Sequence, residues 1–437
     1  MSVKSRNILL FAVMGALLIA VGIIQSANVA LAILNLCLIS AIMTLGVNIQ
    51  WGYAGLFNAG VMGFAALGGL AAVLVSFPPV SDAWAVGGAR AMLGVVTGAI
   101  SIVLAILAFK RVPGSRRVRG WAAALVALTG IILMRLILDP AVEAIEAVEP
   151  AKTGFLGGLG LPIALSWVAG GAFAALAAWG IGKIALGLRS DYLAIATLGI
   201  SEIIIYFLKN EDWLVRGVKN VNGLPRPVPY EIELQKTLWV QELAAQFDFN
   251  VIELSSIIVK LSYAGLFIVV LTIVFWLSER ALKSPWGRMM RAIRDNEVAA
   301  SAMGKDVTWR HLQVFVLGSA VIGLAGAMLT TLDGIFTPAS YQPLRFTFLI
   351  WVMVIVGGSG NNLGSILGGF AIWFFWIEAE PIGLALIELL TSGMAEDSAL
   401  RLHLIENAAH TRLATMGVVL LLVLRFSPRG LIPERGK

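Results

Sequence analysis

The stretch "MSVKSRNILLFAVMGALLIAVGIIQ" (residues 1–25) decides the class of fold, because it has the length and composition of a membrane-spanning helix. A helix needs about 20 consecutive apolar residues to cross roughly 30 Å of hydrocarbon. The basic start and apolar centre also suit a secretory signal peptide. No convincing small-residue cleavage site follows, and the apolar run is long enough to span. We therefore expect a retained first transmembrane helix.

Apolar runs of the same kind recur along the whole chain. Of its 437 residues 59% are hydrophobic and 13% are charged, which is about half the charged fraction usual in soluble domains. A soluble fold cannot bury so much apolar surface, and lipid-exposed backbone must satisfy its own hydrogen bonds. The sequence therefore predicts an all-α polytopic membrane protein of about 10–12 transmembrane helices, with a single domain over 1–437. The expected spans are 8–25, 29–49, 56–77, 91–109, 121–138, 161–186, 192–208, 257–278, 312–332, 346–357, 364–378 and 410–425.

The charges between these spans indicate an orientation. Lys4 and Arg6 place the amino terminus in the cytoplasm by the positive-inside bias. Counting alternate crossings then puts the basic turn "KRVPGSRRVRG" (110–120) and the basic carboxyl-terminal tail on the same side. The acidic loop 139–150 and the polar segment 209–256 fall outside, so 209–256 is predicted to be periplasmic.

This agreement favours an even number of spans, about twelve, with both termini cytoplasmic. Two segments are weak: 346–357 is short, and glycine and asparagine interrupt 49–60. Ten or eleven crossings therefore remain open. The net charge of +6 is explained by basic residues beside apolar segments, so nucleic acid is not an expected partner, whereas membrane lipid is.

The residue inventory disfavours an enzyme. The sequence contains no G-x-x-x-x-G-K-[ST] phosphate loop, and its three histidines are too scattered for a metal site of recognisable spacing. We expect no metal, no cofactor and no catalytic residue in this chain. Cys37 lies in an apolar run and is expected to be a small packing residue.

Polar residues at membrane depth are the candidates for a translocation path. Glu202 lies about eleven residues into its expected helix. It has two interpretations, a carboxylate hydrogen-bonded inside the bundle or a group that lines the path. The run "GGSGNNLG" (357–364) does not suit a membrane helix and predicts a tight polar turn. The candidate path residues are Asn48, Gly52, Asn58, Glu202, Gly357 and Gly358.

The charged segment "LKSPWGRMMRAIRDNEVAASAMG" (282–304) lies between two very apolar regions. Ser284 and Pro285 suit a helix start, and Gly304 suits a helix end. Apolar and small residues recur every three or four positions between them, which predicts one or two short amphipathic helices on the cytoplasmic surface. Such helices either rest on anionic lipid or dock a cytoplasmic partner. The small residues Ala299, Ala300 and Gly304 favour docking.

Several pieces of the chain, in the same order, resemble branched-chain amino-acid ABC permeases of the LivM type. They are "LGVNIQWGYAGLFNAGVMGF" (45–64), "LRSDYLAIATLGISEII" (188–204), "GRMMRAIRDNEVAASAMGKDVTWRHLQVFVLGSAVIGLAGAM" (287–328), "IVGGSGNNLGSILGGF" (355–370) and "FSPRGLIP" (426–433). The resemblance implies a permease subunit that pairs with a second permease, of LivH type in a heterodimer. It also implies two cytoplasmic ATPases, a periplasmic substrate-binding protein and a location in a bacterial inner membrane.

The same resemblance makes residues 282–311 the cytoplasmic coupling loop. Within the family pattern E-A-A-x-x-x-G, Ala299, Ala300 and Gly304 match, whereas Val298 occupies the glutamate position and the acid is shifted to Glu297. The residues it implies for ATPase coupling are Arg291, Arg294, Glu297, Ala299, Ala300 and Gly304.

Three features depart from the family pattern. The segment "VRGVKNVNGLPRP" (215–227) lacks paired glycines, and Asn58 and Val61 stand where serine and histidine are frequent. Residues 86–150 look like an inserted transmembrane hairpin.

The expected function is import of branched-chain or other neutral amino acids, driven by ATP hydrolysis on separate subunits. A permease for urea or short amides is one alternative. An ion-coupled secondary carrier that uses Glu202 or Asp191 is another, and a channel or membrane scaffold is a third.

Overall fold

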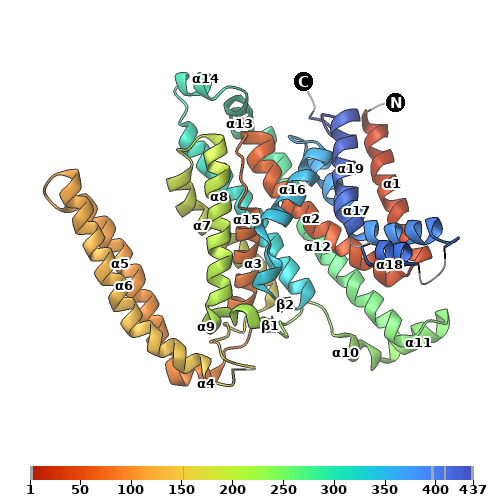
Figure 1. Ribbon diagram of the computed structural model, residues 1–437, viewed down its shortest axis with the longest axis horizontal. Helices are drawn as coiled ribbons and strands as arrows, with labels where there is room; N and C mark the ends of the chain where they lie inside the picture. The colour runs from red at the N-terminus through yellow and green to blue at the C-terminus, as the bar shows by residue number, and fades with distance from the viewer. Residues whose placement is uncertain (1–2, 151, 395–397, 408–409, 435–437) are drawn as a thin grey trace.

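The computed structural model describes the chain except for residues 1–2, 151, 395–397, 408–409 and 435–437. Almost all of the ordered elements are helices, arranged as a bundle with one projecting hairpin (Figure 1). The long elements are α1 (Val3–Ile24), α2 (Ala27–Val47), α3 (Val61–Ser76), α5 (Ala89–Arg111), α6 (Arg116–Glu146), α7 (Ile163–Ala185), α8 (Ser190–Asn210), α12 (Val251–Lys283), α15 (Val307–Asp333), α16 (Pro343–Gly357), α17 (Asn362–Leu390) and α19 (Thr411–Phe426).

Short elements connect the long ones. They are α4 (Ser81–Ala83), α9 (Asp212–Val215), α10 (Glu231–Gln235), α11 (Leu238–Phe247), α13 (Pro285–Asp295), α14 (Glu297–Ala302), α18 (Ala399–Glu406), β1 (Val221–Asn222) and β2 (Ile335–Phe336), with π-helical turns at Asn48–Gly52 and Trp84–Gly88 and 3-10 turns at Gly217–Lys219 and Pro338–Ser340. The two strands pair antiparallel, with Val221 opposite Phe336 and Asn222 opposite Ile335.

Each of the twelve predicted spans overlaps one of the long helices, and the all-α polytopic class is confirmed. Within the described residues, nine helices are long and apolar enough to cross a membrane, and α3 and α16 are shorter apolar helices. At 1.5 Å per residue, the 16 residues of α3 reach only about 24 Å. The non-helical residues 55–60 precede it and extend its course through the bundle.

The middle of the bundle is formed by α2, α3, α7, α15 and α17. Its helices approach closely because glycine lies at the crossings. A Cβ at Gly68 would lie 1.8 Å from the carbonyl oxygen of Gly323, so any side chain there would separate α3 from α15. Small residues at helix contacts are the usual route to tight packing in membranes, where burial from water gives no driving force between helices.

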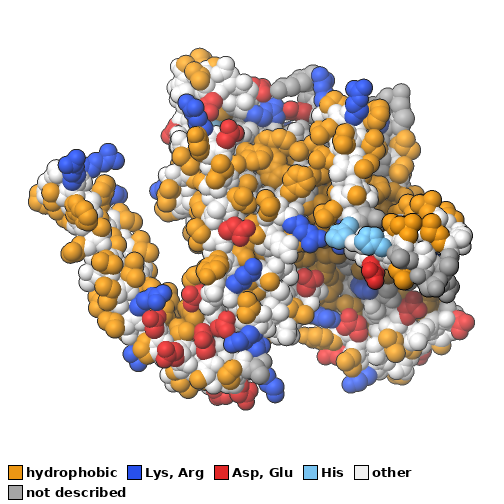
Figure 2. All heavy atoms as spheres, viewed as in Figure 1, with side chains coloured by type: hydrophobic (Ala, Val, Ile, Leu, Met, Phe, Trp, Pro, Cys, Tyr) orange, Lys and Arg blue, Asp and Glu red, His pale blue; other side chains and the backbone are white. Residues whose placement is uncertain are grey.

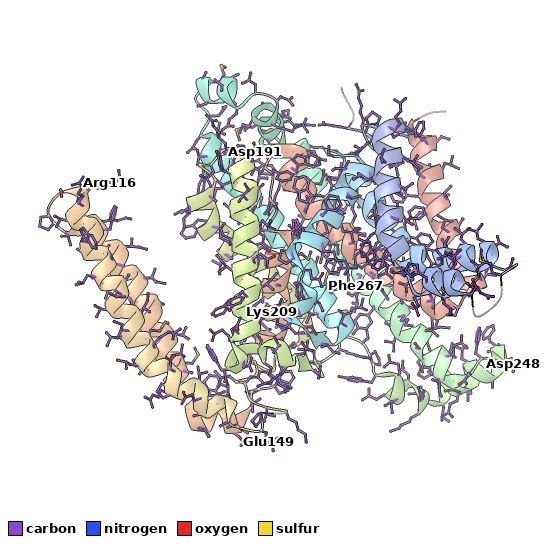
Figure 3. The ribbon with its side chains drawn as sticks, viewed as in Figure 1. Arg116, Glu149, Asp191, Lys209, Asp248 and Phe267 are labelled. Atoms are coloured by element: carbon purple, nitrogen blue, oxygen red, sulfur yellow. The ribbon has the colours of Figure 1, made fainter. Side chains whose placement is uncertain are left out.

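The hairpin formed by α5 and α6 projects from the bundle and touches it only near its base (Figure 1). Hydrophobic side chains cover its shaft, and basic side chains gather at its free end (Figure 2). Arg116 lies at that end, and Glu149 lies beside the base (Figure 3). The base is fixed by a small apolar cluster that includes Ala91, Ala141 and Ile145 from the hairpin and Trp213 from α9. That this hairpin is an insertion stays a prediction.

The connections divide between two opposite edges of the bundle. The start of α1, the end of α19 and the pair α13–α14 lie at one edge, and α4, α9, β1 and α10 lie at the other (Figure 1). The free end of the α5–α6 hairpin points toward the α13–α14 edge. The basic turn at Arg116 therefore lies on the side of α13 and α14, whereas the acidic loop at Glu149 lies toward the other edge (Figure 3). Which edge faces the cytoplasm stays a prediction.

Candidate functional site: the junction beneath α13 and α14

The charged segment after α12 folds as two helices, α13 and α14, which meet at Asn296. Its boundaries are narrower than the predicted 282–311, because α12 continues to Lys283 and α15 begins at Val307. Pro285 occupies the first turn of α13 as predicted, but the Ser284 hydroxyl does not cap that helix. It donates instead to the Ala281 carbonyl at 2.6 Å. The cap of α14 is Asn296, whose side chain accepts a hydrogen bond from the Ala299 amide at 2.9 Å.

One face of this pair packs against the bundle. Met290 is 0% exposed and Ile293 is 2% exposed, so α13 is anchored by apolar contacts. Ala300 is also buried, which places it among the residues that fix α14. Gly304 follows α14 with φ +74°, a left-handed backbone conformation that favours glycine.

The other face of α14 is open. Val298 and Met303 are each 79% exposed, and Glu297 and Ala299 lie beside them in the exposed part of the helix. Large apolar side chains with this exposure, flanked by small ones, suit a protein partner better than water. Of the six residues predicted for ATPase coupling, Glu297, Ala299 and Gly304 lie at this surface.

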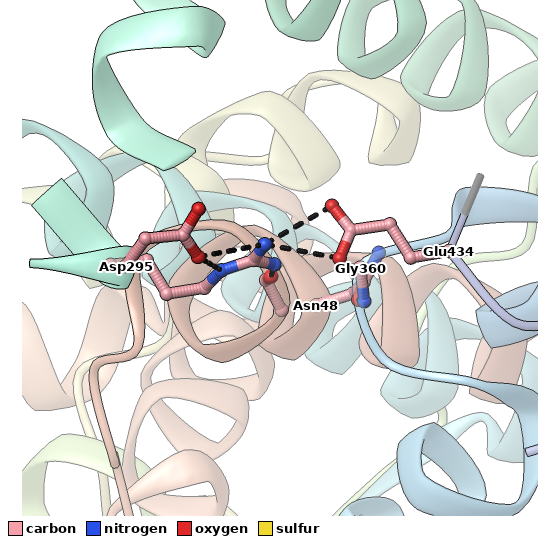
Figure 4. Close-up of polar contacts among 6 residues, drawn as sticks. Asn48, Asp295, Gly360 and Glu434 are labelled. Carbon is pink, nitrogen blue, oxygen red and sulfur yellow. Dashed lines mark hydrogen bonds and ion pairs between the residues drawn. The ribbon is translucent and has the colours of Figure 1, made fainter. Parts of the chain in front are cut away.

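Arg294 points the other way, into the bundle. Its guanidinium donates from Nη1 to the carbonyl of Gly52 and forms an ion pair from Nη2 to Glu434 at 3.0 Å. A second, longer contact joins it to the neighbouring Asp295 at 3.4 Å. The side chains of Arg294 and Glu434 are only 16% and 18% exposed, so the pair is largely shielded from water. Figure 4 shows these polar contacts, with Asp295 and Glu434 on opposite sides. Arg291, also predicted for coupling, donates to the Leu282 carbonyl at 3.4 Å and lines the same small pocket as Glu434.

The carbonyl that Arg294 holds belongs to a broken helix. After α2 the backbone passes through a π-helical turn over Asn48–Gly52 and then leaves the helix. Asn48 is 0% exposed and accepts a hydrogen bond from the Gly360 amide at 2.9 Å, while its own amide donates to Asn362 at 3.0 Å. A Cβ at Gly52 would lie 2.1 Å from the Asn48 Oδ1 atom, so only glycine fits there.

Tyr53 and Glu279 extend this network. Both are joined to Asn362, which accepts from the Tyr53 hydroxyl at 3.2 Å and donates to the Glu279 carboxylate at 3.0 Å. Burial raises the pKa of the Tyr53 phenol, and the nearby Glu279 carboxylate raises it further, so the hydroxyl stays a neutral donor. Glu279 is also paired with Lys283 at 3.0 Å, one helical turn further along α12.

A second polar cluster holds the non-helical residues after the break. Asn58 donates to Gln50 at 2.9 Å, and Gln50 donates to the Phe315 carbonyl at 2.9 Å and to the Ser319 hydroxyl at 3.0 Å. Trp351 donates to the Asn58 carbonyl at 3.1 Å. Gln50 and Asn58 are both 0% exposed, so the polar groups freed by the broken helix are satisfied by protein.

The glycine turn after α16 completes the junction. Gly357 accepts from the Ile432 amide at 2.9 Å, and Asn361 donates to the Pro433 carbonyl at 3.0 Å. Gly358 has φ +117°, and a Cβ there would lie 2.3 Å from the Ile432 carbonyl oxygen. The tail after α19 therefore lies directly against the turn predicted from "GGSGNNLG".

The structure thus brings together two residues of the predicted coupling set, Arg291 and Arg294, and four of the predicted path set, namely Asn48, Gly52, Gly357 and Gly358. Glu202 lies apart from them, on the exposed face of α8, and it is not buried inside this bundle. Figure 3 marks the two ends of α8 with Asp191 and Lys209. Sequence reasoning missed Gln50 and Glu434. Gln50 could have been found, because it is a polar residue between the predicted path residues Asn48 and Gly52. No pattern in the sequence around Glu434 pointed to its role.

Comparison with known proteins gives a consistent picture. Residues 29–424 match the family model described as branched-chain amino acid transport system / permease component. The chain is 30% identical over 211 residues to the high-affinity branched-chain amino acid transport system permease protein LivM of Escherichia coli K12, over 47% of each chain. It is 25% identical over 248 residues to a probable branched-chain amino acid transport permease protein LivM of Methanocaldococcus jannaschii, over 57% of this chain and 61% of the relative. The aligned parts span about half the length of these curated relatives. No solved structure matches.

Proposed function

The chain belongs to the family of branched-chain amino acid transport system permease components, and from this premise we propose that it is a membrane-spanning subunit of an ATP-driven importer of branched-chain or other neutral amino acids. It carries out no covalent chemistry. The proposed partners are a second permease of LivH type in a heterodimer, two cytoplasmic ATPases and a periplasmic substrate-binding protein. The names of the relatives and the buried polar junction support this function.

The single observation that carries the mechanism is the contact of Arg294 with the broken helix. We propose that an ATPase binds the open face of α14 and moves α13 and α14 together. Because Arg294 holds both the Gly52 carbonyl and Glu434, such a movement pulls on the end of α2 and on the tail beside the glycine turn. Nucleotide and substrate then act at separate sites and bias the same two states, which is the requirement for allosteric coupling.

The proposed orientation puts α13, α14 and both termini in the cytoplasm. The basic residues Arg288, Arg291 and Lys305 in and after these helices support that side. The opposite edge, with α9, β1 and α10, then faces the binding protein. Substrate would enter at that edge and leave near the junction.

The test is uptake into liposomes that contain the chain with its proposed partners. ATP enclosed in the liposomes, on the side of the ATPases, should drive leucine uptake. Omission of ATP or of the binding protein should abolish this uptake. Transport of leucine by this chain alone on a proton gradient would refute the ABC assignment. ATP-driven uptake of urea with no uptake of leucine would refute the substrate class.

A further inference from the structure

A cavity of about 400 Å³ lies between α2, α15, α16 and α17, toward the edge of the bundle that carries β1 and β2. Its volume is in the range of small-molecule sites. Half of the lining residues are aliphatic, namely Leu36, Ile39, Met43, Met62, Leu329, Ile335 and Ile350. Trp373 and Phe346 close one side, with their ring centroids 6.5 Å apart. The wall is shaped for an aliphatic group.

The polar groups of this cavity are few. Asp333, at the end of α15, is the acidic residue among those that line it, and no Lys, Arg or His lines the described cavity. Its side chain is exposed and forms no hydrogen bond or ion pair with another residue in the part of the chain that the structure describes. Arg226 lies near Gly334 on the neighbouring segment, but it is already paired with Glu231 at 2.9 Å.

Hydroxyl groups accompany the carboxylate. Ser40 on α2 and Thr337 and Ser340 on the loop after β2 all line the cavity. These side chains can donate hydrogen bonds to an anionic oxygen without adding a positive charge. A ligand with an ammonium group, a carboxylate and an aliphatic side chain therefore finds a counterpart for each part.

The wall is fixed before any ligand binds. The Tyr341 hydroxyl is hydrogen-bonded to Thr330 at 2.7 Å, and it is packed so closely that a Cβ at Gly69 would lie 2.4 Å from it. Ile335, which lines the cavity, is held in register by its pairing with Asn222. A preformed site avoids the cost of ordering its groups on binding.

Resting on the proposed function, we infer that this cavity is a binding site for the imported neutral amino acid inside the chain. Asp333 receives the ammonium group, and the apolar wall between α2 and α16 receives the branched side chain. The site lies at the edge opposite α13 and α14, which is the proposed entry side.

Binding to the purified full-length chain in detergent tests this inference by calorimetry, without ATP or partners. Three probes separate the contributions: L-leucine, isopentylamine, which lacks the carboxylate, and isocaproic acid, which lacks the ammonium group. We expect leucine to bind most tightly, isopentylamine to bind more weakly, and isocaproic acid to bind worst. Asp333→Asn should weaken leucine and isopentylamine about tenfold or more, because a hydrogen bond to a charged group is lost.

Two further variants are compared with Asp333→Asn, one as a control and one as a test of the cavity wall. Glu242→Gln removes the same charge from an exposed position on α11 and should leave all three affinities unchanged. Ile335→Trp adds bulk at a residue that lines the cavity and is 42% exposed, so it should reduce binding while the chain stays folded. Thermal unfolding of each variant checks folding.

The inference is overturned if leucine does not bind, if isocaproic acid binds as tightly as leucine, or if Asp333→Asn binds leucine normally. Failure of the proposed function gives a different result. If leucine binding depends on Asp333 but ATP never drives uptake by the assembled transporter, only the importer assignment fails. If ATP drives uptake and Asp333→Asn does not reduce it, only the cavity assignment fails.

Discussion

At the scale of single residues, Arg294 joins segments that are far apart in the sequence. Its partners Gly52 and Glu434 lie 242 and 140 positions away. Removing one partner of a largely buried ion pair typically costs about 3–5 kcal/mol, because the remaining charge loses its compensation. The contacts of Arg294 therefore stabilise the fold and, in the proposed mechanism, transmit the movement of α13 to α2.

Arg294→Met is expected to lower the unfolding temperature and to reduce ATP-driven leucine uptake about tenfold or more while ATP hydrolysis continues. That combination is the signature of uncoupling. Arg288→Met is the matched control, because Arg288 is exposed on the same helix. Equal effects of the two substitutions on uptake would contradict the role given to Arg294. Uptake and hydrolysis are measured in the same liposomes.

Gly52→Ala tests the broken helix at the same scale. The added methyl group would lie 2.1 Å from Asn48 and 2.6 Å from the Gly360 amide, so it must displace the hydrogen bond between them. We expect a loss of about 1–3 kcal/mol in the free energy of unfolding. Gly199→Ala on α8 has open space around the new Cβ and should be neutral or slightly stabilising. Thermal unfolding of both variants in detergent measures this difference. Equal unfolding temperatures would contradict the close packing of Gly52 against Asn48 and Gly360.

At the scale of elements, α14 presents two large apolar side chains to solvent while Ala300 anchors it beneath. Met303→Glu is expected to reduce co-purification of the ATPases strongly, because it places a charge in the proposed apolar contact. Val118→Glu, at an exposed position in the basic free end of the α5–α6 hairpin, is the control. Retention of the ATPases by Met303→Glu would exclude α14 as the docking helix.

The α5–α6 hairpin is the other element that can be tested as a unit. Gly94 and Leu138 face each other across it, since a Cβ at Gly94 would lie 2.9 Å from the Leu138 Cβ. Deleting residues 95–137 and joining these two positions with a short flexible linker should preserve the cluster at the base. We expect unfolding temperature and uptake close to those of the intact chain. A large loss of uptake would show that the shaft contacts a partner.

At the scale of the whole molecule, the connections between helices lie at two opposite edges of the bundle, which the proposed orientation assigns to the two sides of the membrane. Cys37 is 0% exposed, so a membrane-impermeant maleimide should leave it unmodified and give a clean background. Ser301→Cys on α14 should react only from the cytoplasmic side, and Thr237→Cys before α11 only from the outer side. The side on which each cysteine reacts is measured by comparing maleimide labelling in intact cells with labelling in inverted membrane vesicles. Reaction of both cysteines from one side would refute the orientation.

The spans could be predicted from the sequence, because each is set locally by the length of an apolar run. Asn48, Gly52 and Gly357 could also be found, since polar and glycine residues at membrane depth stand out. The partners of Asn48 and Gly52 could not, because contacts across 242 to 314 positions leave no local pattern.

Glu202 illustrates a different difficulty. Leu193, Thr197, Ser201 and Ile205 recur every four residues and form the buried face of α8. Glu202 lies one position beyond Ser201, so it turns away from the bundle. The position of Glu202 along its helix could be read from the sequence, but the direction of its side chain depends on which helices pack against α8.

Glu434 also determines when the junction can close during biosynthesis. Glu434 follows α19 in the sequence, so Arg294 emerges from the ribosome together with its neighbour Asp295 but long before Glu434 is translated. Until α19 has been inserted, the Arg294 guanidinium must remain hydrated or pair with another anion such as the neighbouring Asp295 carboxylate. The contact between Arg294 and Glu434 can therefore form only after all the helices from α1 to α19 have been synthesised.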